Sequence, residues 1–443
     1  MSATRSEGET PAAQAGGPEA KEFDYPIKDE DIAAAQLLIG HDVAGGIQEY
    51  YSEASRDAIR NFAMSYGDDN PLFTDFDYGK TTRWGGQIAP GMIINCLGNV
   101  TYGDPIPQDI KKKTRGLFSG VHVFVSGQST EWYRPIQPGD ELYSFGGTES
   151  VTEKASEFAG RSVIRVHRTV RVNQRAEIVA VNRMLSIMTE RKKSRERGKY
   201  MDIEPASYTD ADLAAIDEVY AAERRRGAES RYFEDVTVGE ELPKMAKGPF
   251  TLTDIISFHA GGSQLRPYGW GPSRLWYKSR QRIPKFYIKN AMGIPDVAQR
   301  LHWESEWSQQ IGNPMAYDYA INRECWLNHY LSDWVGDDGW VLRQHDEMRK
   351  FNYVGDTHFI TGEVTGKRVE DGRCYVDLEM RATNQRGTVT APGAATVLLP
   401  SREHGPVVLP EPPVDLQARA VEILVRHREI AAQKQAGKLA KES

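Results

Sequence analysis

The chain has few cysteines and no long apolar run, and both absences limit the classes of protein to which it can belong. Its 443 residues include three cysteines, Cys96, Cys325 and Cys374, which are widely spaced and odd in number. They suggest neither a disulfide framework nor a Cys-x-x-Cys metal knuckle, which is typical of the reducing cytoplasm. No run approaches the roughly 18 apolar residues of a membrane span. The N-terminus also lacks the apolar core of a signal peptide.

The sequence also lacks an excess of positive charge. Its 55 Lys and Arg against 62 Asp and Glu give a formal net charge of −7, which argues against nucleic acid as the main partner. The 40% hydrophobic and 26% charged residues are typical of a soluble globular protein. We therefore expect a cytoplasmic protein with neither a nucleic-acid nor a membrane partner. At roughly 100–200 residues per domain, the length predicts two or three domains.

Each half of the chain has the same order of predicted elements. Runs rich in Val, Ile and Thr predict antiparallel strands, at 120–136, 161–173 and 177–191 in the first half and between 358 and 400 in the second. Helical periodicity predicts helices at 52–67, 91–100, 208–227, 320–334 and 414–435. This order indicates an α+β architecture that occurs twice.

Matching residues in the two halves support an internal repeat. The matched pairs are Ile59 with Ile255, Phe62 with Phe258 and Pro71 with Pro267 at an offset of 196 (255 − 59), then Gly139 with Gly355 and Asp140 with Asp356 at an offset of 216 (355 − 139). The offset grows by 20 residues (216 − 196), which predicts an insertion in the second half. The segment 272–293 is the candidate for this insertion.

The stretch YGDDNPLF, residues 66–73, has a structural and a functional interpretation. Gly67 can end a helix, Asp68 and Asn70 favour turns, and Pro71 prevents the preceding helix from continuing. Alternatively, Asp68 or the adjacent Asp69 serves as a general base, and Asn70 orients a substrate or a water. Spacing alone does not separate the two.

The segment that follows, residues 81–98, combines a glycine loop with an apolar stretch. Gly85 and Gly86 make the loop, and Pro90 and Gly91 lead into the predicted helix. Backbone N–H groups at a helix start lack partners and carry partial positive charge, so they can bind an oxygen that becomes negative during a reaction. The alternative is an ordinary entry from a loop into a helix.

These motifs together resemble the MaoC-like hydratase/dehydratase family, which includes R-specific enoyl-CoA hydratases and hydroxyacyl dehydratases. The residues that carry the resemblance are Gly67-Asp68-Asp69-Asn70-Pro71-Leu72, Ala89-Pro90-Gly91-Met92 and Pro138-Gly139-Asp140. The resemblance covers about residues 25 to 400. It implies the hot-dog fold, a curved antiparallel sheet wrapped around a central helix, and the repeat implies a double hot-dog.

The domain organisation expected from this resemblance has five parts. They are a disordered tail at 1–22, an N-terminal hot-dog domain at 23–200, a linker helix at 201–230, a C-terminal hot-dog domain with a degenerate motif at 231–402, and a C-terminal helical tail at 403–443.

The family motif has a histidine where this chain has Phe73. In the family, the motif Asp and His bind the water that adds to or leaves the substrate β-carbon. The resemblance therefore assigns catalytic roles to Asp68 and Asn70. It assigns oxyanion binding to the backbone amides of Gly91 and Met92. We expect substrate contacts from Phe73, Trp84 and Pro90, the last of which stands where the family commonly has histidine.

The second half has lost the motif, because Gln264 and Arg266 stand at the positions of Asp68 and Asn70 (68 + 196, 70 + 196). It offers His259 as a substitute catalytic group, although a packed helix histidine is the simpler interpretation. His329 lies in an apolar helix, where a core position is expected. Seven of the nine tryptophans lie in the second half, either as core packing or around a pocket for a bulky acyl group.

The resemblance predicts a hydro-lyase that adds water to an enoyl thioester or removes it from a 3-hydroxyacyl thioester, without a metal or a redox cofactor. The thioester is carried by coenzyme A or by an acyl carrier protein. The basic runs at 191–199 and 278–282 either meet coenzyme A phosphates or are solvated charge. We expect a homodimer or higher oligomer, or a heteromer with a related hot-dog subunit. The alternatives are a non-catalytic acyl-thioester-binding subunit, which the loss of the motif histidine favours, and a thioesterase.

Overall fold

The computed structural model describes residues 27–118, 121–156, 160–189, 202–263 and 272–442. The expected N-terminal tail at 1–22 and the basic run at 191–199 lie outside these residues. Among the described residues, no helix is long and apolar enough to cross a membrane.

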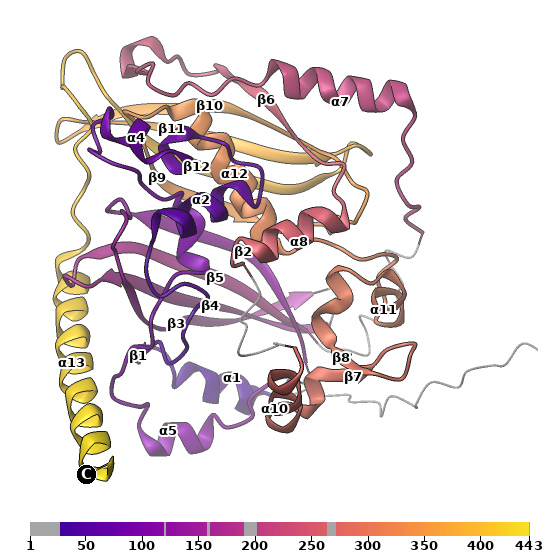
Figure 1. Ribbon diagram of the computed structural model, residues 1–443, viewed down its shortest axis with the longest axis vertical. Helices are drawn as coiled ribbons and strands as arrows, with labels where there is room; N and C mark the ends of the chain where they lie inside the picture. Colours follow the sequence, from indigo (N-terminus) through magenta and orange to yellow (C-terminus); the bar gives the residue numbers. More distant parts are fainter. Residues whose placement is uncertain (1–26, 119–120, 157–159, 190–201, 264–271, 443) are drawn as a thin grey trace, which may run out of the picture.

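A single ten-stranded antiparallel sheet forms the body of the protein (Figure 1). Its strand order is β1-β3-β4-β5-β2-β9-β12-β11-β10-β6. The N-terminal strands are β1 (Val43–Ala44), β2 (His122–Trp132), β3 (Leu142–Ser156), β4 (Gly160–Asn173) and β5 (Ile178–Thr189). The C-terminal strands are β6 (Glu241–Lys247), β9 (Trp340–Glu347), β10 (His358–Glu370), β11 (Arg373–Asn384) and β12 (Val389–Leu399).

The sheet is two copies of one five-stranded pattern joined edge to edge. Read from its outer edge, the N-terminal copy has the order β1-β3-β4-β5-β2, and the C-terminal copy has the order β6-β10-β11-β12-β9. The copies meet where β2 pairs with β9, at Gly127 opposite Glu347 and Glu131 opposite Arg343. One hydrophobic core spans both copies. This is the predicted α+β double hot-dog architecture.

A pair of matching helices, one in each copy, confirms the predicted repeat. Helices α2 (Arg56–Met64) and α8 (Leu252–Ala260) have the same length, and both of their ends are 196 residues apart (252 − 56, 260 − 64). Ser55 caps α2 through its side chain, which accepts a hydrogen bond from the Ala58 N–H, and Thr251 precedes α8 at the equivalent position.

The central helices of the two copies differ. Helix α12 (Ala320–Val335) has 16 residues and is buried along most of its length, as predicted. Its N-terminal counterpart is only a five-residue 3-10 helix, η1 (Gly91–Asn95). The prediction of a helix to residue 100 is therefore wrong in its extent. After η1 the backbone pairs with Tyr51 instead, because the Tyr51 N–H donates to the Cys96 carbonyl at 2.9 Å and Tyr51 accepts from the Gly98 N–H at 3.0 Å.

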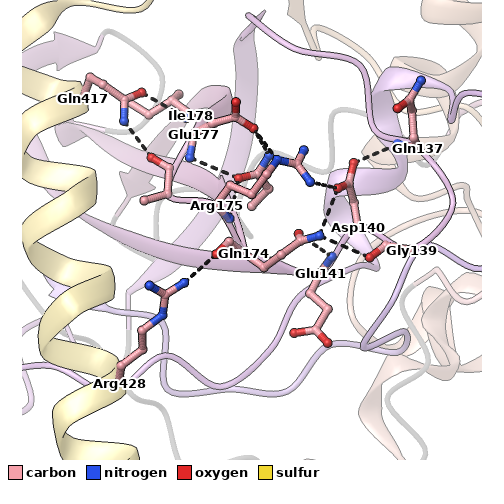
Figure 2. Close-up of polar contacts among 12 residues, drawn as sticks. Gln137, Gly139, Asp140, Glu141, Gln174, Arg175, Glu177, Ile178, Gln417 and Arg428 are labelled. Atoms are coloured by element: carbon pink, nitrogen blue, oxygen red, sulfur yellow. Dashed lines mark hydrogen bonds and ion pairs between the residues drawn. The ribbon is translucent and has the colours of Figure 1, made fainter.

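Each copy also contains a buried aspartate that holds the turn before its longest strand. Gly139 and Gly355 adopt left-handed conformations, with φ of 93° and 97°, and the following Asp140 and Asp356 face inward. Figure 2 shows Asp140 accepting hydrogen bonds from the Gln137 N–H at 2.9 Å and from the side chains of Gln174 and Arg175. The same groups recur around Asp356: the Tyr353 N–H, Gln385 and Arg386. We call these two arrangements the aspartate clasps.

The remaining elements cover or extend this body. Helix α13 (Val414–Glu442) packs through Leu416, Ala420 and Ile423 on the N-terminal strands, along one side of the molecule (Figure 1). Helix α7 (Asp210–Ala222) lies between the copies in sequence and contacts β6. The second half contains an inserted group of elements: α10 (Arg274–Arg282), η3 (Pro284–Phe286), β7 (Tyr287–Lys289), β8 (Pro295–Val297), η4 (Ala298–His302) and α11 (Ser305–Gln310). Shorter elements are α1 (Asp29–Gln36), α3 (Pro71–Thr74), α4 (Phe76–Lys80), α5 (Gln108–Lys113) and η2 (Phe233–Asp235).

Candidate active site

The motif GDDNP forms a tight connection between two helices. Helix α2 ends at Met64, Gly67 takes a left-handed conformation with φ of 80°, and the Asp68 N–H donates back to the Ala63 carbonyl. The Asn70 side chain then accepts a hydrogen bond from the Leu72 N–H at 3.0 Å and caps α3. Pro71, which lacks an N–H, is the first residue of α3. The local chemistry therefore turns Asp68 and its neighbour Asp69 in different directions.

Asp68 faces the interior and is only 1% exposed. Its Oδ1 accepts from the Asn70 N–H at 3.1 Å, and its Oδ2 accepts from the Tyr66 hydroxyl at 3.3 Å. Burial raises the pKa of the Asp68 carboxyl, while the nearby His329 opposes that rise. Asp69 is instead exposed and forms an ion pair with Arg225 at 2.6 Å. The structure therefore separates the two candidate bases by their environment.

A histidine from the other copy lies next to Asp68. His329 is on α12, is 4% exposed, and places its Nε2 at 3.7 Å from Asp68 Oδ1 and at 3.3 Å from Asp333 Oδ2. On its other side, His329 Nδ1 lies 2.7 Å from the Nζ of Lys247 on β6. An ammonium group can only donate, so a charged Lys247 leaves the imidazole proton on Nε2, which faces the two carboxylates.

These four residues form a buried cluster of Asp68, Lys247, His329 and Asp333. Burial lowers the pKa of the Lys247 ammonium, whereas Asp68 and Glu223 favour its charged form. The Oδ1 atom of Asp333 is buried without a hydrogen-bond partner among the described residues. A buried polar atom without a protein partner is a common position for a bound water.

A small cavity of about 70 Å³ lies between the two copies, next to this cluster. The N-terminal copy contributes Asn70, Phe73, Trp84 and Gly91 to its wall, and the C-terminal copy contributes residues of α12, of the turn before β9 and of the start of β9. Among these are Asn328, Ser332 and Trp340. Phe73 therefore occupies the cavity wall, where the family motif places its histidine.

The cluster lies directly behind the cavity wall. Asn70 lines the cavity two residues after Asp68, and Asn328 and Ser332 line it on either side of His329 in α12. Neither Asp68 nor His329 is itself part of the wall. The Asn70 oxygen is used to cap α3, so its amide nitrogen remains as a donor. Asn328 donates to Gln344 at 3.0 Å, which leaves its oxygen as an acceptor.

Part of the expected oxyanion-binding site lies at the cavity. Gly91 lines it, and glycine is required there because a Cβ would come within 2.8 Å of the Trp132 ring. The indole N–H of Trp132 donates to the Gly91 carbonyl at 2.9 Å, which fixes this peptide. Met92 is buried in the core, and neither Met92 nor Pro90 lines the cavity. Trp84 does line it and is held by a hydrogen bond from its indole N–H to the Asp337 carbonyl.

The structure does not bring His259 to Asp68 in any contact among the described residues. Its Nε2 instead lies 2.9 Å from the Tyr319 hydroxyl, its ring meets that of Trp303 edge-on, and burial lowers its pKa to about 4. The sequence favours His259 over His329, because the apolar pattern of residues 320–334 predicts a core helix. The signal for His329 was a polar stripe on that helix: Asn328, His329, Ser332 and Asp333 at i, i+1, i+4 and i+5.

Of the six tryptophans of the second half that the structure describes, only Trp340 lines the cavity. Trp326 and Trp334 belong to the shared core, and Trp276 and Trp307 lie in the inserted group. Most tryptophans of this half are therefore packing residues, and Trp270 lies outside the described residues. No group of three or more His, Cys, Asp or Glu side chains in the described part of the chain is placed to hold a metal ion.

Several known proteins are similar to this chain in sequence or in fold. Residues 38–182 match the family model "FAS1-like, dehydratase domain region". A "UPF0336 protein" of Streptomyces avermitilis is 29% identical over 114 residues, which is 26% of this chain and 70% of that protein. A solved structure entitled "MaoC-like dehydratase" matches with 16% identity and a TM-score of 0.53, over 82% of this chain and 99% of that one. A Mycobacterium tuberculosis protein described as having a double hot-dog fold matches over 83% of this chain and 97% of its own, with 10% identity and a TM-score of 0.43.

Proposed function

We propose that this chain, whose predicted resemblance to the MaoC-like hydratase/dehydratase family is confirmed, is a hydro-lyase acting on an acyl thioester. It adds water to the β-carbon of an enoyl thioester or removes it from a 3-hydroxyacyl thioester. The catalytic pair is divided between the two copies: Asp68 comes from the N-terminal motif and His329 comes from the C-terminal central helix. Phe73 then contacts the substrate instead of performing chemistry.

One observation carries this proposal, namely the 3.7 Å separation between His329 Nε2 and Asp68 Oδ1. The motif alone lacks its histidine, and the pairing of the copies supplies another beside the same aspartate. Two further features support it. The pKa of Asp68 is raised by burial, which makes the carboxylate a stronger base, and Asp333 has a buried oxygen available to a water.

The proposed hydration step uses one water and no other reactant. The water is held by Asp68 and His329 and is oriented by the amide of Asn70. Asp68 takes one of its protons as the oxygen bonds to the β-carbon. The alkene electrons move to the thioester carbonyl, whose oxygen becomes negative and is bound by the backbone amide of Gly91, which lines the cavity. The enolate collapses as the α-carbon receives the proton from Asp68, and the reverse sequence releases water.

Substrate access requires the cavity wall to move. The cluster is behind Asn70 and Asn328, and a cavity of about 70 Å³ does not hold an acyl chain without displacement of side chains. We propose that the thioester enters between the copies, past Trp84 and Trp340, carried by coenzyme A or a carrier protein. The proposed protein is cytoplasmic and forms a homo-oligomer or a heteromer with a related hot-dog subunit.

The same burial favours a second candidate, an acyl-thioester-binding subunit without activity of its own. Asp68 is 1% exposed and His329 is 4% exposed, and the residue that does reach the cavity is the inert Phe73. On this alternative, the cluster only stabilises the contact between the copies.

A panel of enoyl-CoA esters separates the two candidates. The purified protein is incubated with each ester, and the loss of the enoyl absorbance is followed. Asp68→Asn is expected to lower kcat by roughly 10²- to 10⁴-fold, the usual contribution of a general base. Asp69→Asn is the matched control, because it changes an adjacent, exposed carboxylate in the same way and is expected to retain activity.

Equal activity in the two variants would overturn the assigned mechanism. Absence of turnover with every ester, together with saturable binding of an acyl-CoA measured by calorimetry, would instead establish the binding subunit. Release of free thiol without loss of the enoyl group would show a thioesterase.

A further inference from the structure

The inserted group of the C-terminal copy forms a firmly held lobe, which we call the basic lobe and define as residues 272–300. The fully buried Arg300 holds it together by donating to the carbonyls of Ile288, Asp296 and Val297. The Trp276 indole N–H donates to the Pro295 carbonyl at 3.0 Å and ties α10 to the hairpin of β7 and β8. These contacts give the lobe a fixed shape.

The charge of the basic lobe is opposite to that of the whole chain. The protein has a formal net charge of −7, yet residues 255–295 contain no Asp or Glu at all. The cationic side chains of this stretch within the lobe are Arg274, Lys278, Arg280, Arg282, Lys285 and Lys289. Five of these six residues are exposed. The exception is Arg280, which stacks on Trp276. No ion pair joins any of the six to a carboxylate of the described residues.

Large apolar side chains are exposed on the same lobe. Met292 is 76% exposed at the hairpin tip, with Ile294 at 45% beside it. Along α10 and the following turn, Tyr277 is 55% and Leu275 is 42% exposed. Ile283 and Ile288 bring the total to six of the 24 exposed large hydrophobic residues of the described chain, within 20 consecutive positions. Burying such side chains in a partner is favourable, so their clustering marks a contact surface.

We propose that the basic lobe docks the protein on an anionic lipid surface. Cations around protruding apolar side chains are the combination that binds the interface of a bilayer, where the apolar groups enter the acyl boundary and the cations meet lipid phosphates. The shape favours a bilayer over an acidic protein. Met292 and Ile294 project from the tip of a hairpin, whereas protein interfaces place apolar residues in a packed centre and are depleted in lysine.

The position of the lobe separates this contact from the proposed reaction. None of the residues lining the cavity belongs to the basic lobe. Figure 1 shows α10, β7 and β8 in the lower right of the view and α4, which follows the motif loop, in the upper left. The lobe is thus poorly placed for the phosphates of a thioester bound in the cavity, which was one interpretation of the run 278–282. Surface docking needs no membrane span, and the expectation of no membrane partner rested on the lack of one.

The test is flotation of the full chain with vesicles of phosphatidylcholine alone or mixed with phosphatidylglycerol. Binding is expected only to the mixed vesicles and is expected to weaken as salt is added. The triple variant Arg282→Glu, Lys285→Glu, Lys289→Glu is expected to bind at least about a hundredfold more weakly, since each lost cation near an anionic surface contributes about fivefold and each new carboxylate is repelled. The tip variant Met292→Asp, Ile294→Asp is expected to lose binding as well.

Matched controls distinguish the lobe from general charge and hydrophobicity. The triple variant Arg224→Glu, Lys244→Glu, Arg381→Glu makes the same change in net charge on exposed residues elsewhere. Val238→Asp, Val408→Asp removes two apolar side chains that are 61% and 59% exposed outside the lobe. Both controls are expected to bind like the native chain, and thermal unfolding of every variant checks the fold.

Three outcomes would overturn the proposal. They are an absence of flotation with mixed vesicles, equal losses in lobe and control variants, and retention by an immobilised polyglutamate column without vesicle binding. The last would assign the lobe to an acidic protein.

Discussion

The two copies of the hot-dog pattern contribute different residues to the proposed site. The N-terminal copy retains the motif with Asp68 and Asn70, but its central helix is reduced to the five residues of η1. The C-terminal copy retains the 16-residue α12 with His329, but has Gln264 and Arg266 in place of the motif. The aspartate clasps, in contrast, are present in both copies.

This difference separates structural from chemical requirements. Each copy must close its own sheet, so each needs a clasp. Only one site is needed where the copies meet, so its parts can be divided between them. On the proposed function, Phe73 removes the motif histidine from one copy, and the other copy places His329 beside the same aspartate.

The largest effect on stability is expected at the clasps. Asp356 is 1% exposed and pairs with Arg386 at 2.5 and 2.6 Å, so Asp356→Ala is expected to cost about 3 kcal/mol of unfolding free energy. Asp140 pairs with the more exposed Arg175 at 3.2 Å, and Asp140→Ala is expected to cost about 2 kcal/mol. Urea unfolding measures both.

Asp69→Ala removes an exposed aspartate and serves as the control for these two variants. If both substitutions lower the free energy of unfolding equally, the exposure of the partner arginine does not determine how much a clasp stabilises the fold. A cost for neither would show that the clasps are not structural.

The sequence predicted the repeat and the fold because both depend on local patterns. The offset of 196 matches both ends of α2 and α8, and the Gly-Asp pairs mark the two clasps. The Val-, Ile- and Thr-rich runs indicated antiparallel strands, since this signal depends on neighbouring residues.

The divided site was not predicted, because it depends on a contact between residues 261 positions apart (329 − 68). The packing of the two copies, which includes the pairing of β2 with β9, brings His329 to Asp68, and no local pattern encodes that packing. The extent of η1 was wrong for a related reason. Its apolar residues favour any buried structure, and hydrogen bonds to Tyr51 decide against a longer helix.

A pH effect is expected from the C-terminal copy. Burial raises the pKa of Asp346 on β9 to about 7, with Glu324 of α12 nearby. The unfolded chain releases this proton near pH 4, so stability is greatest below that value and falls as pH rises toward 7. The Asp346→Asn variant has no ionisable group at this position. Its urea midpoint is therefore expected to change less between pH 5 and 8 than that of the native chain.

Glu347→Gln alters a partly exposed neighbour that is paired with Arg349, and it is expected to leave that change intact. If both variants behave like the native chain, Asp346 is not the source of the pH dependence.

The smallest effect is expected at the surface contact between the motif loop and the linker. Arg225 pairs with Asp69 at 2.6 Å, but the Asp69 side chain is 86% exposed. Exposed ion pairs contribute little, so Arg225→Ala is expected to cost less than about 1 kcal/mol in urea unfolding. A larger loss would mean that this exposed pair, and not only the buried cluster, holds the copies together.

The most direct test of the divided site is the kcat of His329→Gln, alone and combined with Phe73→His. The single variant is expected to lose roughly 10²- to 10⁴-fold in kcat with the best enoyl-CoA substrate. His358→Gln, which alters a fully buried histidine of β10, controls for lost stability. Restoring the motif histidine with Phe73→His is expected to recover part of that loss. Full activity in His329→Gln, or an equal loss in His358→Gln, would contradict the claim that the two copies share one catalytic pair.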